Sequence, residues 1–253
     1  MIYIAFMIFT LLVLIFVFYQ WQYFMIFSPL YYREEPLCEA CRLLSITTED
    51  GVELEGVVYE PKNYKNRLLV FVGRSHDAVG LINRFVKLYP HTQIITFNYR
   101  AYGKSGGVAS EKNFLQDGLR IAQLVKKNYG DFYLLGFSIG SSVAAYVASK
   151  VNVKGLFLVG AFDSIASVAT KKFGINLSAM LRYKFNTKKF MQNVDAPTYL
   201  FVSKDDELTY IENARVLKKS IKNLVYYIEF DGLVHKDLLW DERTVAKIKE
   251  VVE

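Results

Sequence analysis

Cysteine, proline and histidine are all scarce in this sequence. Its 253 residues include only two cysteines, five prolines and three histidines. So few prolines, and no low-complexity tract, argue against a long disordered linker. Cys38 and Cys41 form one C-x-x-C, but no second such pair or histidine pair is present to complete a four-ligand zinc site. We therefore expect two ordinary thiols or a local disulfide there, rather than metal or redox chemistry.

Charge is missing from the start of the chain, because the first 32 residues carry no charged side chain. Residues 1–19 are almost wholly apolar, and about 19 helical residues at ~1.5 Å each span a hydrocarbon core of about 30 Å. A cleaved signal peptide would have a basic leading region and an A-x-A-like site, which this segment lacks. A buried core helix is rarely so long and uniformly apolar. Aromatic residues suited to a membrane–water interface follow, at Tyr19, Trp21, Tyr23, Tyr31 and Tyr32.

We therefore expect residues 1–27 to be a single-pass membrane anchor, 28–42 a juxtamembrane linker and 43–253 a folded domain. Arg33 and Arg42 favour a cytoplasmic domain, but two arginines leave the side of the membrane open. The formal charge of +6 fits an anionic membrane surface or an acidic substrate. This charge is diffuse and accompanies no nucleic-acid-binding motif, so a nucleic acid partner is not expected. The oligomeric state stays open.

Strand and helix patterns alternate along the domain. Residues 43–48 and 52–59 flank an Asp-Gly turn and predict a hairpin. Further strands are predicted at 68–72, 93–97, 132–135, 153–159, 198–202 and 225–230, and helices at 78–88, 112–129, 141–148, 211–219 and from 238 onward. This alternation predicts an α/β domain, with a mostly parallel central sheet, helices on both faces and the antiparallel hairpin at its start.

A G-x-S-x-G motif, Gly136 to Gly140, lies between the strand predicted at 132–135 and the helix predicted at 141–148. A serine on so sharp a strand-to-helix turn is strained, and the flanking glycines give the turn room. The turn aims the N–H of Ile139 and the positive end of the helix at the space beside the serine oxygen. The motif alone is a weak signal, but this context predicts that Ser138 is a nucleophile.

A serine hydroxyl needs a histidine to accept its proton, and the imidazole needs a carboxylate to fix its tautomer. His76 precedes the serine and His91 lies at a helix–strand connection. His235, in the loop after the last predicted strand, is therefore the expected general base.

The acid should follow a strand between the serine and the histidine. On the residues alone, three candidates directly after the strand at 198–202 stay open: Asp205, Asp206 and Glu207. An oxyanion hole needs a second N–H besides that of Ile139, from the loop after the strand at 68–72. We expect the backbone N–H of Arg74 to supply it, while Gly73 allows the substrate to approach closely.

Residues 161–195 interrupt the alternation of strands and helices. They include a short amphipathic stretch at 177–185 and the basic residues Lys171, Lys172, Arg182, Lys184, Lys188 and Lys189. Two interpretations stay open. The segment is either a solvated surface insertion or a small cap over the active site that faces an anionic membrane surface.

Together these segments resemble the α/β-hydrolases, in particular the membrane-associated α/β-hydrolase-domain serine hydrolases that include protein depalmitoylases. The resemblance spans roughly residues 46–240, and the order of serine, acid and histidine is that of α/β-hydrolases. It rests on the serine turn, the acid and histidine loops, the region 162–165 and a Tyr-Arg-x-Tyr-Gly-x-Ser-x-Gly run at 99–107. The family's acid loop, G-x-x-D-x-[ILV]-V-P, laid on residues 203–210, implies that Asp206 is the catalytic acid.

Two departures from the family pattern concern the walls of the pocket. The oxyanion loop, usually His-Gly-Asn, is Val72-Gly73-Arg74 here, and the usual Val-Pro after the acid is Thr209-Tyr210. Neither removes a catalytic atom, because the oxyanion donor is a backbone group. Both change the shape of the pocket and therefore bear on the substrate.

The resemblance implies an α/β-hydrolase fold with a small cap insertion and a membrane-anchored serine hydrolase. Ser138, His235 and Asp206 would cleave an ester, thioester or amide of a lipid-like or acyl-protein substrate. Ile139 and Arg74 would be the oxyanion donors, and no metal or organic cofactor is required. The alternative is a non-catalytic binding or scaffolding protein that retains the fold.

Overall fold

One eight-stranded sheet forms the centre of the molecule. The computed structural model describes residues 2–33 and 36–253, and its strands lie in the order β1-β2-β4-β3-β5-β6-β7-β8. β1 (Cys41–Thr47) and β2 (Glu53–Tyr59) form an antiparallel hairpin, and β2 pairs antiparallel with β4 (Gln93–Phe97). From β4 to β8, neighbouring strands run parallel. The expected mostly parallel sheet with a hairpin at its start is confirmed.

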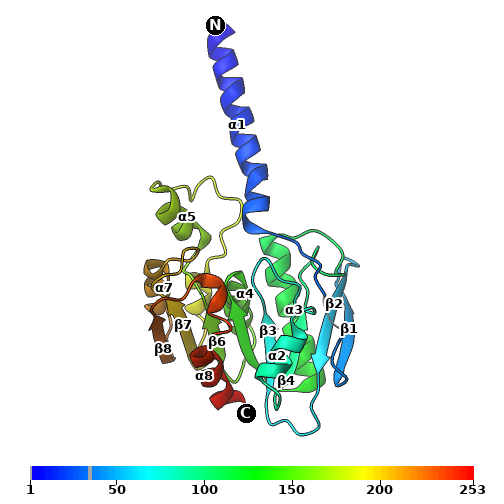
Figure 1. Cartoon of the computed structure of the whole chain (residues 1–253). Coiled ribbons are helices and arrows are strands. Elements are labelled where there is room, and N and C mark those ends of the chain that lie inside the picture. The colour runs from blue at the N-terminus through cyan, green and yellow to red at the C-terminus, as the bar shows by residue number, and fades with distance from the viewer. Residues whose placement is uncertain (1, 34–35) are drawn as a thin grey trace.

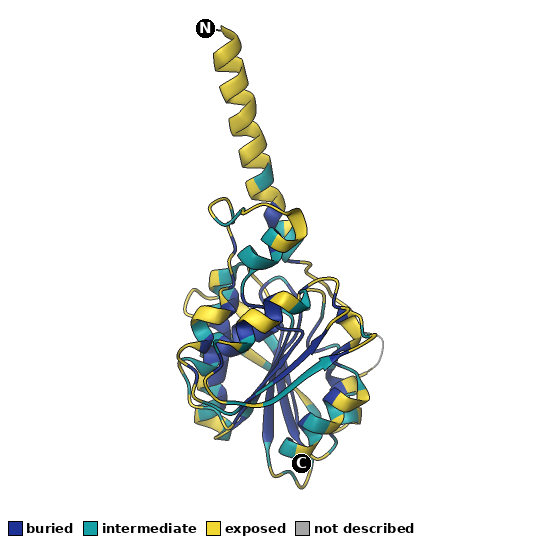
Figure 2. Ribbon diagram, turned by 90° about the vertical axis from the view of Figure 1, so that its left-hand side faces the viewer, coloured by how far each residue is buried: buried dark blue, intermediate teal, exposed yellow. Residues whose placement is uncertain are grey.

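Helices cover both faces of this sheet (Figures 1 and 2). α2 (Ile82–Leu88) and α8 (Glu242–Val252) lie on one face, and α3 (Glu111–Tyr129) and α4 (Ile139–Ala148) lie on the other. Because both faces are covered, the inner strands are buried along their length, which explains their unbroken apolar runs. The remaining strands are β3 (Arg67–Phe71), β5 (Tyr133–Phe137), β6 (Leu156–Val159), β7 (Thr198–Ser203) and β8 (Leu224–Phe230).

The segment 161–195 contains two helices that were not predicted from the sequence. No helix forms over 177–185; instead α5 (Ile165–Phe173) and α6 (Thr187–Met191) lie on either side of it. α5 ends at Gly174, whose φ of 72° is left-handed and stops the helix. A further helix, α7 (Ile211–Lys218), packs on β7 and contacts α6.

Two predicted helices begin later than expected. α2 starts at Ile82 rather than at residue 78, because residues 78–81 form a turn. α8 starts at Glu242, where the Asp241 carboxylate accepts a hydrogen bond from the Arg243 N–H and caps the helix. Only a short 3₁₀ turn, His235–Asp237, precedes it.

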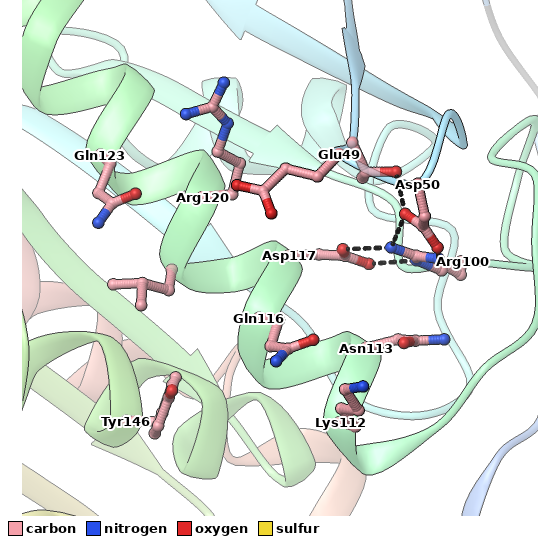
Figure 3. A pocket seen from close by; sticks show the side chains of 12 residues that line it. Glu49, Asp50, Arg100, Lys112, Asn113, Gln116, Asp117, Arg120, Gln123 and Tyr146 are labelled. Atoms are coloured by element: carbon pink, nitrogen blue, oxygen red, sulfur yellow. Dashed lines mark hydrogen bonds and ion pairs between the residues drawn. The ribbon is translucent and has the colours of Figure 1, made fainter.

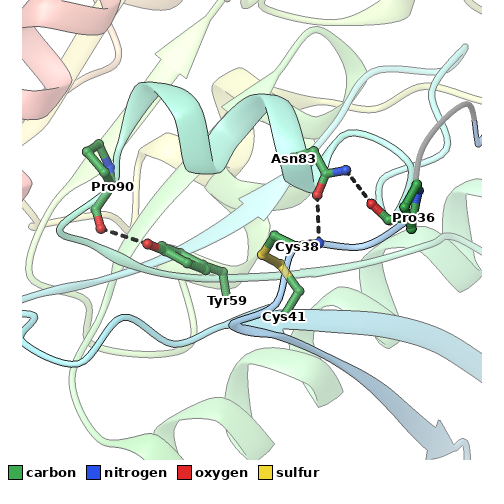
Figure 4. Close-up of a disulfide and its surroundings, with 6 residues drawn as sticks. All are labelled: Pro36, Cys38, Cys41, Tyr59, Asn83 and Pro90. Carbon is green, nitrogen blue, oxygen red and sulfur yellow. Dashed lines mark hydrogen bonds between the residues drawn. A yellow bond between two sulfur atoms is a disulfide. The ribbon is translucent and has the colours of Figure 1, made fainter.

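The two cysteines form a disulfide, Cys38–Cys41, with a Cα–Cα distance of 5.1 Å (Figure 4). Asn83 in α2 holds the same stretch of linker. Its side-chain oxygen accepts from the Cys38 N–H at 3.0 Å, and its amide donates to the Pro36 carbonyl at 2.8 Å. The linker is therefore tied to the domain just before β1.

α1 (Ile2–Ile26) projects from the domain for most of its length (Figures 1 and 2). Its most apolar 18-residue window has a mean hydropathy of 2.7, enough to cross a membrane by length and composition. Gln22, which is 3% exposed, is the first residue of the helix to be buried. Directly after the helix, Phe27 packs edge-to-face on Phe114 and Tyr183, at ring separations of 5.1 and 4.8 Å.

We expect the substitution Phe27→Ala to lower the free energy of unfolding by about 3–5 kcal/mol, because it empties a buried aromatic site. Phe27 is 1% exposed, whereas Phe24, one turn earlier, is 71% exposed. Phe24→Ala is therefore the matched control, and we expect a change within about 0.5 kcal/mol. Thermal unfolding of the full chain in detergent micelles measures both. Equal losses would show that Phe27 does not hold the helix on the domain.

Candidate active site

Ser138 lies on the turn between β5 and α4, with φ 55° and ψ −123°. Few non-glycine residues adopt positive φ without support, so packing must hold this conformation. Both glycines of the motif are required sterically. A Cβ at Gly136 would lie 2.5 Å from the Gly140 carbonyl oxygen, and one at Gly140 would lie 2.1 Å from that of Phe71.

His235 and Asp206 form a buried pair beside this turn. The His235 Nδ1 and Asp206 Oδ2 atoms are 2.7 Å apart, and the ring of Phe137, the residue before Ser138, stacks on the imidazole at 5.1 Å. The Asp206 carboxylate also accepts from the Thr209 hydroxyl at 2.6 Å and the Thr209 N–H at 2.8 Å. Burial by itself would raise the pKa of Asp206, but these hydrogen bonds and the charge of His235 outweigh it and lower the pKa.

The other two acidic candidates do not reach the imidazole. The Asp205 carboxylate accepts from the Gly232 N–H at 2.6 Å, and the Glu207 carboxylate accepts from the His235 backbone N–H at 3.1 Å. Both hold the histidine loop by its backbone, whereas Asp206 contacts the ring.

Ser138 and His235 both lie beside the ends of β5 and β6. The Ser138 N–H donates to the Val159 carbonyl at 2.9 Å, and the next residue, Gly160, makes room for the imidazole. A Cβ at Gly160 would lie 3.0 Å from His235 Cε1. Within residues 2–33 and 36–253, no hydrogen bond joins the Ser138 hydroxyl to His235. Such bonds are often long in a ligand-free enzyme and tighten with substrate.

Arg74 and Ile139 line the same pocket as Ser138. Neither backbone N–H has a hydrogen-bond partner among the described residues, so both are free to bind an anionic oxygen. The Arg74 guanidinium donates to the Met25 carbonyl at the end of α1. Arg74, which stands where the family usually has asparagine, therefore links the loop after β3 to the N-terminal helix.

His76, which is not the histidine expected to act as the base, also lies near the site. Its ring packs edge-to-face on Phe137 at 5.8 Å, and its Nδ1 is buried without a hydrogen-bond partner in the described part of the chain. Burial lowers the pKa of His76, and the nearby His235 lowers it further. Both effects favour the neutral form of His76. In the sequence, the only indication that His76 lies near the site is its position in the loop after β3.

The pocket at Ser138 has a volume of about 170 Å³ and mostly apolar walls. α1 supplies Met25 and Ile26, a contribution that the sequence did not reveal. The other apolar walls come from the 161–195 segment and the acid loop: Phe162, Ile165, Val168, Ala169, Phe173 and Leu208. Such a lining suits an aliphatic chain.

A separate polar pocket of about 400 Å³ lies between the hairpin turn and α3 (Figure 3). At its centre, Arg100 Nε donates to Asp117 at 2.8 Å and Nη1 donates to Asp50 at 2.6 Å. Both carboxylates form ion pairs with Arg100 and so connect the hairpin turn to α3. Within the 99–107 run, Arg100 therefore has a structural role. None of the expected site residues lines this pocket.

No group of three or more His, Cys, Asp or Glu side chains is arranged to hold a metal ion in the described ranges, 2–33 and 36–253.

No known protein-family model matches the chain. Over 205 residues it is 25% identical to an uncharacterized protein of Acanthamoeba polyphaga mimivirus, covering 71% of this chain and 69% of that protein. Over 189 residues it is 24% identical to the lysophosphatidylserine lipase ABHD12 of Rattus norvegicus, covering 62% of this chain. That match spans 46% of the lipase, less than half of its length.

Among solved structures, the chain is similar to an esterase of Pyrococcus furiosus, Pf2001. The TM-score is 0.67 at 19% identity, over 89% of this chain and 95% of the esterase. It is also similar to a bacterial membrane phospholipase A, with a TM-score of 0.64 at 14% identity, over 83% and 85% of the two chains. The chain has the α/β-hydrolase fold, as expected from its sequence.

We expect Gly140→Ala to lower the free energy of unfolding by roughly 1–3 kcal/mol, because the added methyl group meets backbone atoms that cannot rotate away. At Gly106 a Cβ would have its nearest neighbour at 3.6 Å, an ordinary contact. Gly106→Ala should therefore change stability by less than about 0.5 kcal/mol. Thermal unfolding distinguishes them, and a stable Gly140→Ala protein would contradict the close approach of α4 to β3.

Proposed function

We propose that this chain is a membrane-anchored serine hydrolase that cleaves a carboxylic ester, thioester or amide of a lipid-like acyl substrate. The observation that carries the proposal is the buried 2.7 Å contact between His235 Nδ1 and Asp206 Oδ2 beside the strained turn at Ser138. The esterase and lipase relatives and neighbours support a hydrolase.

The protonation states follow from this contact. An ionised carboxylate only accepts hydrogen bonds, so the proton of a neutral His235 lies on Nδ1 and points to Asp206. Nε2 is then free to take the proton of Ser138 as its oxygen attacks the substrate carbonyl. Protonated His235 next donates to the leaving group, and an acyl group stays on Ser138. Water, deprotonated by His235, releases the acid and restores the serine.

Charge develops on the carbonyl oxygen during both steps. The free N–H groups of Ile139 and Arg74, which line the pocket at Ser138, are the donors we assign to it. The positive end of α4 adds to the same stabilisation.

The apolar pocket indicates that the acyl part is aliphatic. About 170 Å³ of space lies between Ser138 and apolar side chains of α1 and α5. The rat relative is a lysophosphatidylserine lipase and one structural neighbour is a membrane phospholipase A. These relatives agree with a substrate that resides in a membrane.

We propose that α1 stays on the mature protein as its anchor, although a signal sequence would satisfy the same length and composition. Met25 and Ile26 line the pocket, and Gln22 is buried against the domain. Cleavage after this helix would remove these contacts and open the pocket on one side.

Labelling with a fluorophosphonate tests whether Ser138 is activated, and distinguishes a hydrolase from a binding or scaffolding protein on the same fold. We expect the membrane-bound wild type to react and Ser138→Ala to be unreactive. His235→Ala should react roughly a thousandfold more slowly, because the base is lost. His91→Ala, an exposed histidine away from the pocket, is the matched control. A folded wild type that does not react would favour the scaffolding function.

The same assay identifies the acid. We expect Asp206→Asn to slow labelling by roughly a thousandfold or more, since the amide no longer fixes the histidine tautomer. Asp205→Asn should retain the wild-type rate, because that side chain contacts only the backbone of the loop. The opposite ranking would assign the role to Asp205.

We expect kcat/KM for p-nitrophenyl esters to rise about fourfold per added methylene until the pocket is filled, since each buried methylene contributes about 0.8 kcal/mol. Val168→Phe places a larger side chain in the pocket and should lower the value for the octanoate ester more than for the acetate ester. Val216→Phe on the surface of α7 is the control. If Val168→Phe lowered kcat/KM equally for both esters, the acyl chain would bind outside this pocket.

A further inference from the structure

The tip of the 161–195 segment, residues 173–182, lies against the lower part of α1 (Figure 1). Gln22 joins the two, because its side-chain amide donates to the Met180 carbonyl at 2.9 Å and its oxygen accepts from the Arg182 N–H at 2.7 Å. Gln22 is also where α1 first becomes buried. The tip is therefore held at the level where the helix leaves the domain.

That level coincides with the edge of a bilayer. About 20 residues of α1 precede Gln22, and at ~1.5 Å per residue they span about 30 Å, the thickness of the hydrocarbon core. Trp21 and Tyr19, side chains typical of the interface, come just before it. A membrane that surrounds the exposed part of α1 would thus end beside the tip.

The tip carries exposed apolar side chains at that level. Phe173, Ile175 and Met180 are 45%, 60% and 44% exposed. In the linker, Leu30, Tyr31 and Tyr32 form another exposed group close to α1. Over the rest of residues 43–253, the large exposed apolar side chains are scattered among different elements, and isolated ones are normal on a soluble surface. Three within eight residues, next to a membrane helix, indicate a lipid contact.

The charged side chains that residues 164–194 themselves contribute all have one sign. Between residues 164 and 194 there are six lysines and arginines and no acidic residue. Arg182 lies over the Tyr19 ring, with its Cζ 5.0 Å from the ring centroid, and Lys172 is exposed at the rim of the pocket. Lys171 forms an ion pair with Glu212 and is not available. Lys172 and Arg182 have no ion-pair partner among residues 2–33 and 36–253, and such cations suit anionic headgroups.

We propose that residues 173–182 are a second membrane contact, in which Phe173, Ile175 and Met180 enter the interface of an anionic bilayer and Lys172 and Arg182 bind its headgroups. The inference rests on the proposed membrane anchor. Phe173 also lines the pocket at Ser138. The pocket therefore faces the lipid, and an acyl chain enters it from the same leaflet that holds α1.

Quenching by brominated lipids tests the depth of the tip in the full chain reconstituted into vesicles. Trp21→Phe removes one source of background signal and leaves the half-buried Trp240, which lies outside the 161–195 segment. In that protein, Ile175→Trp should lose roughly half of its emission or more in dibromo-phosphatidylcholine, since interfacial segments sit about 5–10 Å into the headgroup region. Val225→Trp is the control, because Val225 is 50% exposed but lies at the amino end of β8, away from the pocket.

The outcomes separate the inference from the function on which it rests. Quenching of wild-type Trp21 but not of Ile175→Trp would overturn the second contact and leave the anchor. No quenching of Trp21 would overturn both. Fluorophosphonate labelling of Ser138 is read independently in the same samples, so loss of hydrolase activity is not confused with loss of membrane contact.

Lipid charge tests the headgroup contact. We expect Ile175→Trp to be quenched more strongly when the vesicles also contain phosphatidylserine. Lys172→Glu with Arg182→Glu should abolish that increase, whereas Lys62→Glu with Lys65→Glu, the same change of charge in an exposed loop after β2, should retain it. The anionic contact would be overturned if phosphatidylserine did not increase the quenching. It would also be overturned if both double variants lost this increase equally.

Discussion

The close approach of α4 to the end of β3 is the constraint on which the site depends. A side chain on Gly140 would collide with the backbone of Phe71, so strand, turn and helix fit together in one way only. The positive φ of Ser138 is held by the two buried elements on either side of it, rather than by any preference of serine. The same turn fixes Phe137, whose ring stacks on the imidazole of His235.

The N-terminal helix is a second constraint, because its last turn belongs to the pocket. Arg74 reaches from the loop after β3 to the Met25 carbonyl, and Gln22 joins the helix to the segment between α5 and α6. Arg74, which differs from the residue that the family usually has in its oxyanion loop, thus connects this loop to the N-terminal helix. A change in how the helix packs on the domain would therefore alter the pocket itself.

The 99–107 run carries part of the family resemblance, but none of its residues lines the pocket at Ser138. In the 99–107 run, Arg100 binds two carboxylates that hold the hairpin to α3, and the Tyr102 hydroxyl accepts from the Ser28 N–H at 2.9 Å. These contacts maintain the fold. The pocket walls come from α1, α5 and the acid loop, and a fold shared with esterases and lipases leaves the chemistry of those walls unspecified.

The sequence by itself determined the parallel sheet, the serine turn and the long apolar helix, because each follows from local spacing, glycine placement or length. It left Asp205, Asp206 and Glu207 open until a family pattern was laid on them. Only the tertiary structure decided which carboxylate contacts His235, since neighbouring side chains on one loop point in different directions. Likewise, the burial of the His76 Nδ1 atom and the presence of Met25 in the pocket depend on contacts between distant segments, which no local pattern encodes.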